Sequence, residues 1–304
     1  DNYDLIKSAN FSYILKNKEN LFYDIGYGFI TKLFSYKINF ATAIFLISNL
    51  FTIPLFIFCS KLKRTYLALT VAYPYFIVVV GMGPIRQAAA IGFVTLAILA
   101  AINNKTNKFI LYSFISSTFH FSSIIFCSII LIPCKSDSKR KLKIFLKIIF
   151  GVLITFFIIY NFEIVYTKIS HYLNMTPDLS TSASSAILIW VINFLPILLH
   201  IKNTQRFNFN KNLNKIIIFF GVYEIFLFIL IFINSVLAYR FLIYCFPISI
   251  YIISSLPDAN IIELKTKYLI NIIISLSFTS LFIWLKFANH AYCWLPYKNI
   301  FLNI

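Results

Sequence analysis

The sequence has little charge, and least of all acidic charge. Only 12% of its 304 residues are charged, and 10 acidic residues stand against 27 basic ones, which gives a formal net charge of +17. A soluble globular domain carries about twice this share of charged residues. Seven glycines and nine prolines are also too few for a disordered chain. The composition therefore argues against both a soluble domain and a disordered one.

Signatures of metal binding and of several common chemistries are missing as well. The five cysteines lie mostly in or beside apolar runs without CxxC spacing, which supports neither a zinc site nor a disulfide framework: Cys59, Cys127, Cys134, Cys245 and Cys293. We predict that they are buried apolar thiols. His171, His200 and His290 lack metal-ligand spacing, and serine-nucleophile, P-loop and dinucleotide-binding signatures are absent. No metal and no cofactor is expected.

Long apolar runs dominate the chain instead. Hydrophobic residues make up 60% of it, and its mean hydropathy is +0.83. A helix needs roughly 20 apolar residues to cross a bilayer. Runs near this length occupy residues 38–58, 65–81, 144–166, 187–201, 216–233, 241–256 and 268–287, with a shorter run at 88–102. We therefore predict an all-α, polytopic integral membrane protein.

Most of the basic residues fall in short loops between these runs, at 61–64, 105–108, 135–143 and 202–215. Short loops rich in Lys and Arg stay on the cytoplasmic side of a membrane, so we expect all four to face the cytoplasm. In a soluble protein the same net charge would suggest nucleic acid. Here membrane lipids are the expected partners, and no nucleic acid is expected.

The apolar run 109–133 has basic loops on both flanks. It should therefore enter and leave the membrane on one side, as a re-entrant hairpin of two half-helices with His120 near its tip. One long tilted helix with a basic flank outside is the alternative. Non-helical backbone at membrane depth is tolerated only where it is buried in protein or lines a cavity. A broken helix with a polar tip therefore predicts a binding cavity.

This topology predicts a single membrane domain over residues 1–304. It would comprise an external amphipathic segment (1–37), the membrane spans (38–288) and an external tail (289–304). The chain begins on Asp1 rather than on Met. A missing first transmembrane helix fits this start best, and a cleaved signal peptide is the alternative. The Gly81–Pro84 turn, His120 and Arg240 would all lie at the outer face.

Arg86 is the first candidate binding residue. It follows the turn Gly81-Met82-Gly83-Pro84, stands beside Gln87, and precedes the small-residue face Ala88-Ala89-Ala90. An arginine at membrane depth is costly and marks a functional site. The amide dipole of a helix start and a guanidinium group together make an anion site. The alternative is an arginine that extends to the membrane interface, which would not need the glycine-proline turn.

Three further residues carry polar groups in apolar surroundings. Arg240 ends a predicted outer connection, 234–239, and could supply a second phosphate contact or simply extend to the interface. His120, followed by Ser122, could be a base, a proton donor or an orienting group, or a structural histidine. Glu224 lies inside a span and is expensive there unless it is paired or protonated. It could serve only to lock helices together.

At these residues the sequence resembles the EpsG-like polysaccharide polymerases, relatives of the Wzy O-antigen polymerases. The segment GPIRQAAAIGF at 83–93, followed by STFHFSS at 117–123, is similar to the arginine-plus-histidine core of that family. Weaker similarities are Asp1 to Tyr3, Asp24-Ile25-Gly26-Tyr27, Tyr239-Arg240-Phe241 with Tyr244 and Phe246, and Trp294 to Asn299. Asp24 stands where the family more usually has Glu.

The resemblance implies a glycosyltransferase with a GT-C-like helical bundle in the bacterial cytoplasmic membrane. It would join undecaprenyl-diphosphate-linked repeat units at the outer face, as donor and acceptor, in O-antigen, capsule or exopolysaccharide synthesis. The implied roles are diphosphate binding by Arg86 and Arg240, activation of the acceptor hydroxyl by His120 or Asp24, sugar stacking by Tyr27, Trp294 and Tyr297, and further substrate contacts from Gln87 and Ser122. No cofactor is implied. A chain-length regulator and a flippase are candidate partners.

Three other classes stay open. An O-antigen ligase shares the chemistry and differs in its acceptor. A transporter of lipid-linked oligosaccharides would also line a cavity with cations, but such proteins often show repeated halves and paired broken helices, and only one broken run is found here. A membrane acyltransferase would need a tighter histidine-acid motif than His120 offers.

Overall fold

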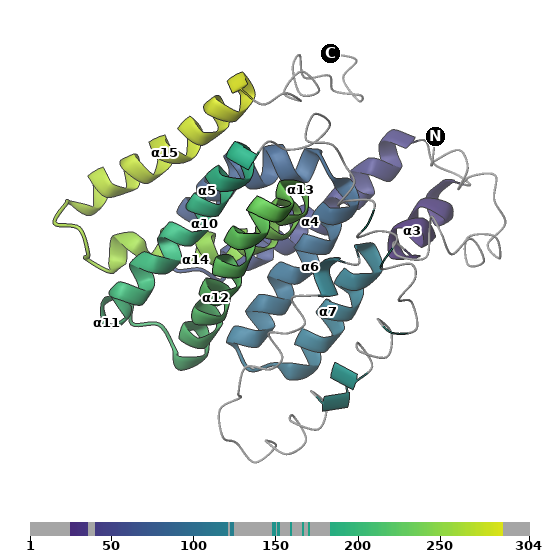
Figure 1. The fold of residues 1–304 in the computed structure, drawn as a ribbon, viewed down its shortest axis with the longest axis horizontal. Helices are drawn as coiled ribbons and strands as arrows, with labels where there is room; N and C mark the ends of the chain where they lie inside the picture. The colour runs from purple at the N-terminus through teal and green to yellow at the C-terminus, as the bar shows by residue number, and fades with distance from the viewer. Residues whose placement is uncertain are drawn as a thin grey trace.

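A computed structural model describes residues 25–35, 40–120, 122–124 and 183–287, together with isolated positions between 148 and 170. The described residues form helices and contain no strand (Figure 1), which confirms the all-α class. In chain order the elements are α3 (Ile25–Ser35), α4 (Phe40–Ser60), α5 (Thr65–Ala72), the π-helix η2 (Tyr73–Gly81), α6 (Ile85–Ile102), α7 (Thr106–Phe119), α10 (Ala183–Lys202), α11 (Thr204–Phe207), α12 (Lys211–Ile233), α13 (Ser235–Leu242), η5 (Ile243–Cys245), α14 (Phe246–Ser255), η6 (Leu256–Asp258) and α15 (Thr266–Phe287).

Several of these helices can cross a membrane. Within the described part of the chain, five segments are long and apolar enough, judged by length and composition: Ile85–Ile102, Ala183–Lys202, Lys211–Ile233, Ser235–Asp258 and Thr266–Lys286. Two shorter apolar helices, Ile44–Ser60 and Thr65–Gly81, accompany them. The protein is thus a multi-pass membrane protein, as predicted. The predicted span 144–166 lies almost entirely outside the described residues.

Helix α6 lies between α4 and α7 and packs extensively against both. Its small-residue face makes this possible. Ala89 and Ala90 are fully buried, and a Cβ atom on Gly92 would come within 2.9 Å of the Phe51 Cα atom in α4. On the other side, the Ser116 hydroxyl of α7 donates to the Ala90 carbonyl oxygen at 2.9 Å. The small-residue face therefore lets neighbouring helices approach α6 closely.

A second group of helices is built on α10, which packs against α12, α13 and α14. The fully buried Asn193 donates from its amide to the Leu242 carbonyl oxygen at 2.9 Å and accepts from the Ser249 hydroxyl. Trp190 donates from Nε1 to the Glu224 carbonyl oxygen at 2.9 Å. A bilayer offers no water to satisfy such groups, so these hydrogen bonds fix α10 relative to its neighbours.

Helix α15 runs along the outside of the molecule, against α5 and η2 (Figure 1). Large apolar side chains along it are exposed, among them Ile272, Leu276, Phe278, Phe282 and Ile283. A contiguous apolar surface of this kind is unusual for a soluble monomer. It suits contact with lipid.

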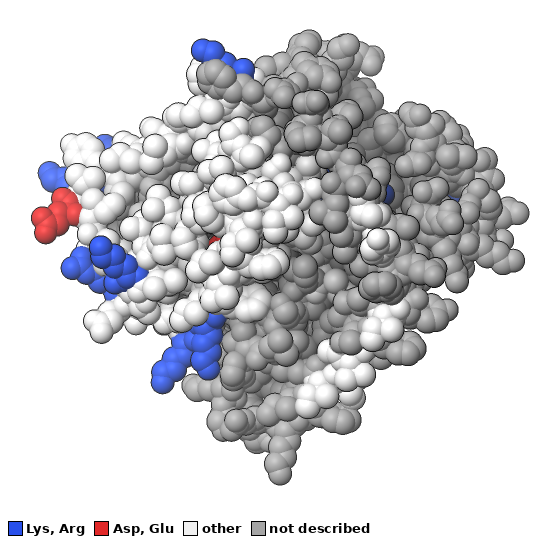
Figure 2. Space-filling view, viewed as in Figure 1, with Lys and Arg blue, Asp and Glu red and all other residues white. Residues whose placement is uncertain are grey.

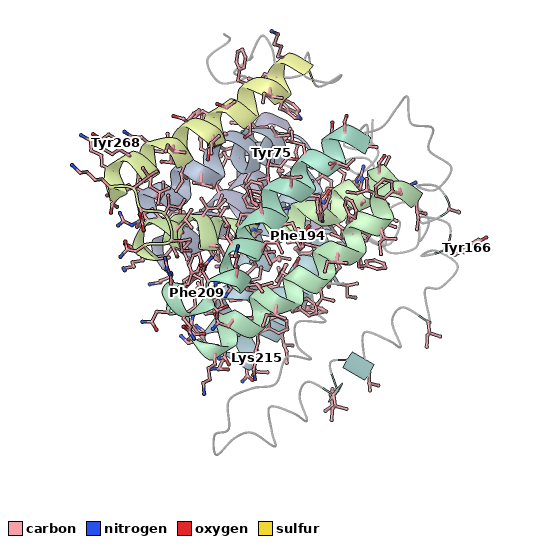
Figure 3. All side chains as sticks on the ribbon, turned by 60° about the vertical axis from the view of Figure 1, so that its left-hand side comes forward. Tyr75, Tyr166, Phe194, Phe209, Lys215 and Tyr268 are labelled. Carbon is pink, nitrogen blue, oxygen red and sulfur yellow. The ribbon has the colours of Figure 1, made fainter. Side chains whose placement is uncertain are left out.

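Basic side chains of several described loops and of the adjoining helix ends gather at one end of the helices, which we call the basic end. It carries Lys61, Lys63, Arg64, Lys105, Lys108, Lys202, Arg206, Lys211, Lys215, Lys265 and Lys267. Most of the blue side chains in Figure 2 lie at the left and lower left of the molecule, and Figure 3 shows nitrogen-tipped side chains near Lys215. Three contacts join these loops. Asn212 donates to the Ile102 carbonyl oxygen, Arg206 to that of Asn260, and Arg64 to Asp258.

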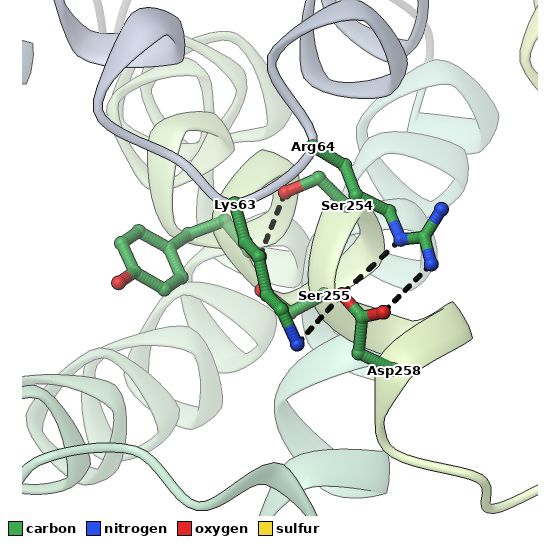
Figure 4. A network of polar contacts seen from close by, with 6 residues as sticks. Lys63, Arg64, Ser254, Ser255 and Asp258 are labelled. Carbon is green, nitrogen blue, oxygen red and sulfur yellow. Dashed lines mark hydrogen bonds and ion pairs between the residues drawn. The ribbon is translucent and has the colours of Figure 1, made fainter.

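Asp258 is the centre of an ion-pair network at the basic end (Figure 4). Its carboxylate accepts from Nε and one terminal nitrogen of Arg64, at 3.1 and 2.7 Å, and lies 3.4 Å from the Lys63 ammonium. The hydrogen bond to Asp258 raises the pKa of Arg64 above its usual value. The network ties the loop before α5 to the end of η6.

The predicted break near His120 is present. Helix α7 ends at Phe119, and His120 has extended backbone angles, φ −155° and ψ 118°. A short 3₁₀ turn follows at 122–124. One continuous helix through 109–133 is therefore wrong. The second half-helix of the predicted hairpin lies outside the described residues.

The predicted outer connection 234–239 is wrong, because this stretch is largely helical. Asn234 ends α12 with extended backbone angles, and its side-chain oxygen caps the next helix by accepting from the Leu237 amide at 2.8 Å. Helix α13 then continues through η5 into α14. Arg240 consequently lies in the last turn of α13. The prediction failed because an asparagine that interrupts an apolar run can cap a new helix as well as begin a loop.

Candidate active site

The start of α6 presents a helix terminus beside an arginine. The π-helix η2 ends in the Gly81–Pro84 turn, and Pro84 occupies the N-cap position with no side chain capping the helix. π-Helical turns are rare and frequent at functional sites. Arg86 is exposed, with its guanidinium 5.8 Å from the centre of the Tyr27 ring. Amide groups at a helix start and a neighbouring guanidinium both favour an anion.

Gln87 connects this helix start to the second arginine segment. Only 2% of Gln87 is exposed. Its Nε2 atom donates to the Arg240 carbonyl oxygen at 2.7 Å. The contact joins α6 to α13 across a sequence separation of 153 residues. Two arginine-bearing turns predicted from distant motifs thus lie next to each other.

A pair of tyrosines lies beside this contact. Tyr75 of η2 is buried and donates from its hydroxyl to the Tyr239 hydroxyl at 2.9 Å. The Tyr75 ring also packs against Phe246, with ring centres 5.4 Å apart. Tyr239 immediately precedes Arg240. The pair therefore holds the Arg240 turn against η2, the same element that leads into the start of α6.

The turn after His120 contacts the segment that follows α13. The Ser123 amide donates to the His120 carbonyl oxygen at 3.1 Å, which closes the turn. The hydroxyls of Ser122 and Tyr244 are 2.9 Å apart and share a hydrogen bond. Tyr244 is fully buried in η5, four residues after Arg240. Ser122 is thereby attached to the segment that carries Arg240.

Helix α3 completes the arrangement. A Cβ atom on Gly26 would lie 2.6 Å from the Thr118 hydroxyl, so a glycine is required for α3 to approach α7 this closely. Its neighbour Tyr27 can therefore reach the Arg86 guanidinium. These contacts bring together the segments that carry Tyr27, Arg86, Gln87, Ser122 and Arg240 with the end of α7 at His120. Asp24, Trp294 and Tyr297 lie outside the described residues.

Sequence reasoning did not assign Tyr75, Tyr239 or Tyr244 a role in the site. Tyr239 and Tyr244 fell within a family-like segment, which was a usable signal. The sequence carried no signal for Tyr75, because an aromatic residue in an apolar run ordinarily lies in the core or at the membrane interface. Its role follows only from the contact with Tyr239.

The EpsG family model matches residues 2–299, nearly the whole chain. The chain belongs to the EpsG family. No curated protein and no solved structure matches it significantly. Membership of the EpsG family supports a polysaccharide polymerase-like glycosyltransferase role in the membrane, in polysaccharide biosynthesis. Such a role is consistent with lipid-linked glycans as substrates.

Proposed function

We propose that this EpsG-family protein polymerises undecaprenyl-diphosphate-linked oligosaccharide repeat units at the outer face of the bacterial cytoplasmic membrane. The observation that carries the proposal is the Gln87–Arg240 hydrogen bond of 2.7 Å. It holds the Arg240 turn against the uncapped start of α6, where Arg86 lies. The backbone of Arg240 thus lies beside the helix start that carries Arg86. Two guanidinium groups aimed at one ligand near a helix terminus would suit two adjacent phosphates.

In the proposed reaction an acceptor hydroxyl oxygen attacks the anomeric carbon of the donor. A new glycosidic carbon–oxygen bond forms while the bond from the anomeric carbon to the diphosphate oxygen breaks. Undecaprenyl diphosphate leaves with the bonding electron pair. Arg86 and Arg240 stabilise the negative charge that develops on this leaving group. Their charge-assisted, bidentate hydrogen bonds to phosphate oxygens strengthen as that charge develops.

The proton of the acceptor hydroxyl must go to a base. His120 and Asp24 are the two candidates. His120 directly follows α7 in a turn attached through Ser122 to Tyr244, which supports the histidine as base or orienting group. We assign Tyr27 to sugar stacking beside Arg86, and Trp294 and Tyr297 to sugar stacking as well. Ser122 is assigned to a substrate contact. Gln87, which is buried and donates to the Arg240 carbonyl oxygen, is assigned to positioning Arg240 instead of the substrate contact that the sequence suggested.

The orientation follows from the basic end. Lys- and Arg-rich loops remain in the cytoplasm, and they lie at the C-terminal end of α6. Arg86 lies near the N-terminal end of this 18-residue helix. A helix of this length spans roughly 27 Å, close to the thickness of a bilayer core. The proposed site therefore faces outward, where a flippase would deliver substrate and a chain-length regulator could act.

The glycan made by cells that lack the protein tests this function. A polymerase predicts single repeat units on the lipid carrier. Polymer stranded on its carrier would instead indicate an O-antigen ligase. Repeat units confined to the cytoplasmic leaflet would indicate a transporter, and either result would overturn the proposal.

A further inference from the structure

A cavity of about 490 Å³ lies at the basic end, at the opposite end of α6 from Arg86. Three lysines line it: Lys61 after α4, Lys105 before α7, and Lys108 in the first turn of α7. Its volume falls within the ~300–1,000 Å³ typical of small-molecule sites. It shares no lining residue with the candidate active site.

The charge of the cavity is not balanced by the described part of the protein. None of its lining residues is acidic. The ion pairs found among the described residues engage Lys63 and Arg64 with Asp258, and none of the three cavity lysines. Three ammonium groups around one cavity repel one another, so an anion that enters it is stabilised by all three.

Other groups in the lining suit a phosphate. Helix α7 begins at the cavity, with Lys105 in its N-cap position and no side chain capping its first amides. The amide-bearing side chains of Asn103 and Asn210 also line the cavity. A helix start supplies hydrogen-bond donors and a favourable dipole to an anion. Here it adds to the charge of the lysines.

The remaining wall of the cavity is apolar, which favours a lipid over a free anion as the ligand. Ile57 of α4 and Leu96 and Leu99 of α6 line the cavity. Ile57 is 39% exposed and lies within the apolar part of its helix. A soluble phosphate gains nothing from such a wall, whereas the first methylenes of an acyl chain do. Basic pockets between transmembrane helices on the cytoplasmic side suit anionic lipid head groups.

We propose that this cavity binds the phosphate head group of an anionic phospholipid from the leaflet at the basic end. The head group would contact Lys61, Lys105 and Lys108, and an acyl chain would lie along α4 and α6. The bound lipid would hold α4, α6 and α7 together at the end remote from Arg86. This proposal does not depend on the polymerase activity, because it concerns a different end of the molecule.

The proposal is tested by titrating the purified wild-type protein in detergent with three probes. These are short-chain phosphatidylglycerol, short-chain phosphatidylcholine and inorganic phosphate, each titrated while the melting temperature and lipid adducts in native mass spectrometry are recorded. Phosphatidylglycerol should raise the melting temperature and remain bound. Equal stabilisation by phosphatidylcholine would overturn the proposal. Stabilisation by inorganic phosphate with none from phosphatidylglycerol would overturn it too, since the ligand would then be soluble.

A matched pair of variants tests whether the lipid binds in this cavity. The triple variant Lys61→Gln, Lys105→Gln and Lys108→Gln removes the cavity lysines, while Lys202→Gln, Lys265→Gln and Lys267→Gln removes as much charge from the same end without touching the cavity. Each lysine near anionic lipid contributes about fivefold in affinity, so the first variant should bind phosphatidylglycerol on the order of 100-fold more weakly. The second should bind it nearly as the wild type does. Equal losses would show a general effect of net charge and overturn the site. If the first variant fails to fold, single Lys105→Gln replaces it against single Lys267→Gln.

Discussion

Gln87 and Arg240 are joined by a 2.7 Å hydrogen bond from the Gln87 amide nitrogen to the Arg240 carbonyl oxygen. The Gln87 side chain is buried, with only 2% of the residue exposed. The contact is made to the backbone of Arg240 and therefore sets the position of that backbone. Gln87 therefore positions the turn that carries Arg240.

Replacing Gln87 with alanine should weaken both the fold and the activity. Loss of an intramolecular hydrogen bond costs about 0.5–1.5 kcal/mol, so the melting temperature in detergent should fall and polymer should shorten. Gln205→Ala is the matched control, because Gln205 is exposed at the basic end. Wild-type polymer from a stably folded Gln87→Ala protein would show that the contact does not position Arg240.

The second prediction concerns the guanidinium of Arg86. Lysine keeps the positive charge and loses the planar fork that binds phosphate oxygens in pairs. Arg86→Lys should therefore impair polymerisation nearly as much as Arg86→Ala, with unchanged amounts of protein in the membrane, as measured by polymer length on gels. Arg206→Lys at the basic end, where Arg206 contacts the Asn260 carbonyl oxygen, should leave polymer length unchanged. Full-length polymer from Arg86→Lys would mean that a point charge suffices.

The sequence predicted much of the fold because a bilayer restricts what apolar runs can do. The predicted run 65–81 coincides with α5 and η2, and the break at His120 also appears. The structure of 234–239 was missed, since a capping asparagine gives no sign of which kind of segment follows it. The pairings of Tyr75 with Tyr239 and of Ser122 with Tyr244 join residues 164 and 122 positions apart. Single-sequence patterns carry no information about such contacts.

The third prediction concerns the orientation of the helices in the membrane. In a background without native thiols, cysteine at Met82 should react with an impermeant reagent added outside intact cells. Cysteine at Asn107 should react only after the membrane is opened. Both positions are exposed and lie near opposite ends of α6. Labelling of position 107 from outside would place the basic end outside and overturn the proposed topology.

The fourth prediction concerns the hydrogen bond between Ser122 and Tyr244. Tyr244→Phe removes one hydroxyl from a fully buried ring and Ser122→Ala removes the other. If the bond holds the His120 turn in place, each single variant should slow polymerisation, and the double variant should be no slower than the worse single one. Losses that multiply in the double-mutant cycle would show that the two hydroxyls act independently.

The last prediction separates proton transfer from positioning at His120 and Asp24. A general base contributes about 10² to 10⁴ in rate, so removing the true base should nearly abolish turnover while substrate binding survives. His120→Ala, His120→Gln and Asp24→Asn are compared in purified enzyme supplied with lipid-linked repeat units, and turnover and substrate affinity are measured separately. Glutamine can still donate a hydrogen bond, so an active His120→Gln beside an inactive Asp24→Asn would make His120 an orienting group and Asp24 the base. The reverse pattern would assign the base to His120. Full activity in both variants would contradict a protein base at either position and leave leaving-group stabilisation by Arg86 and Arg240 as the main source of catalysis.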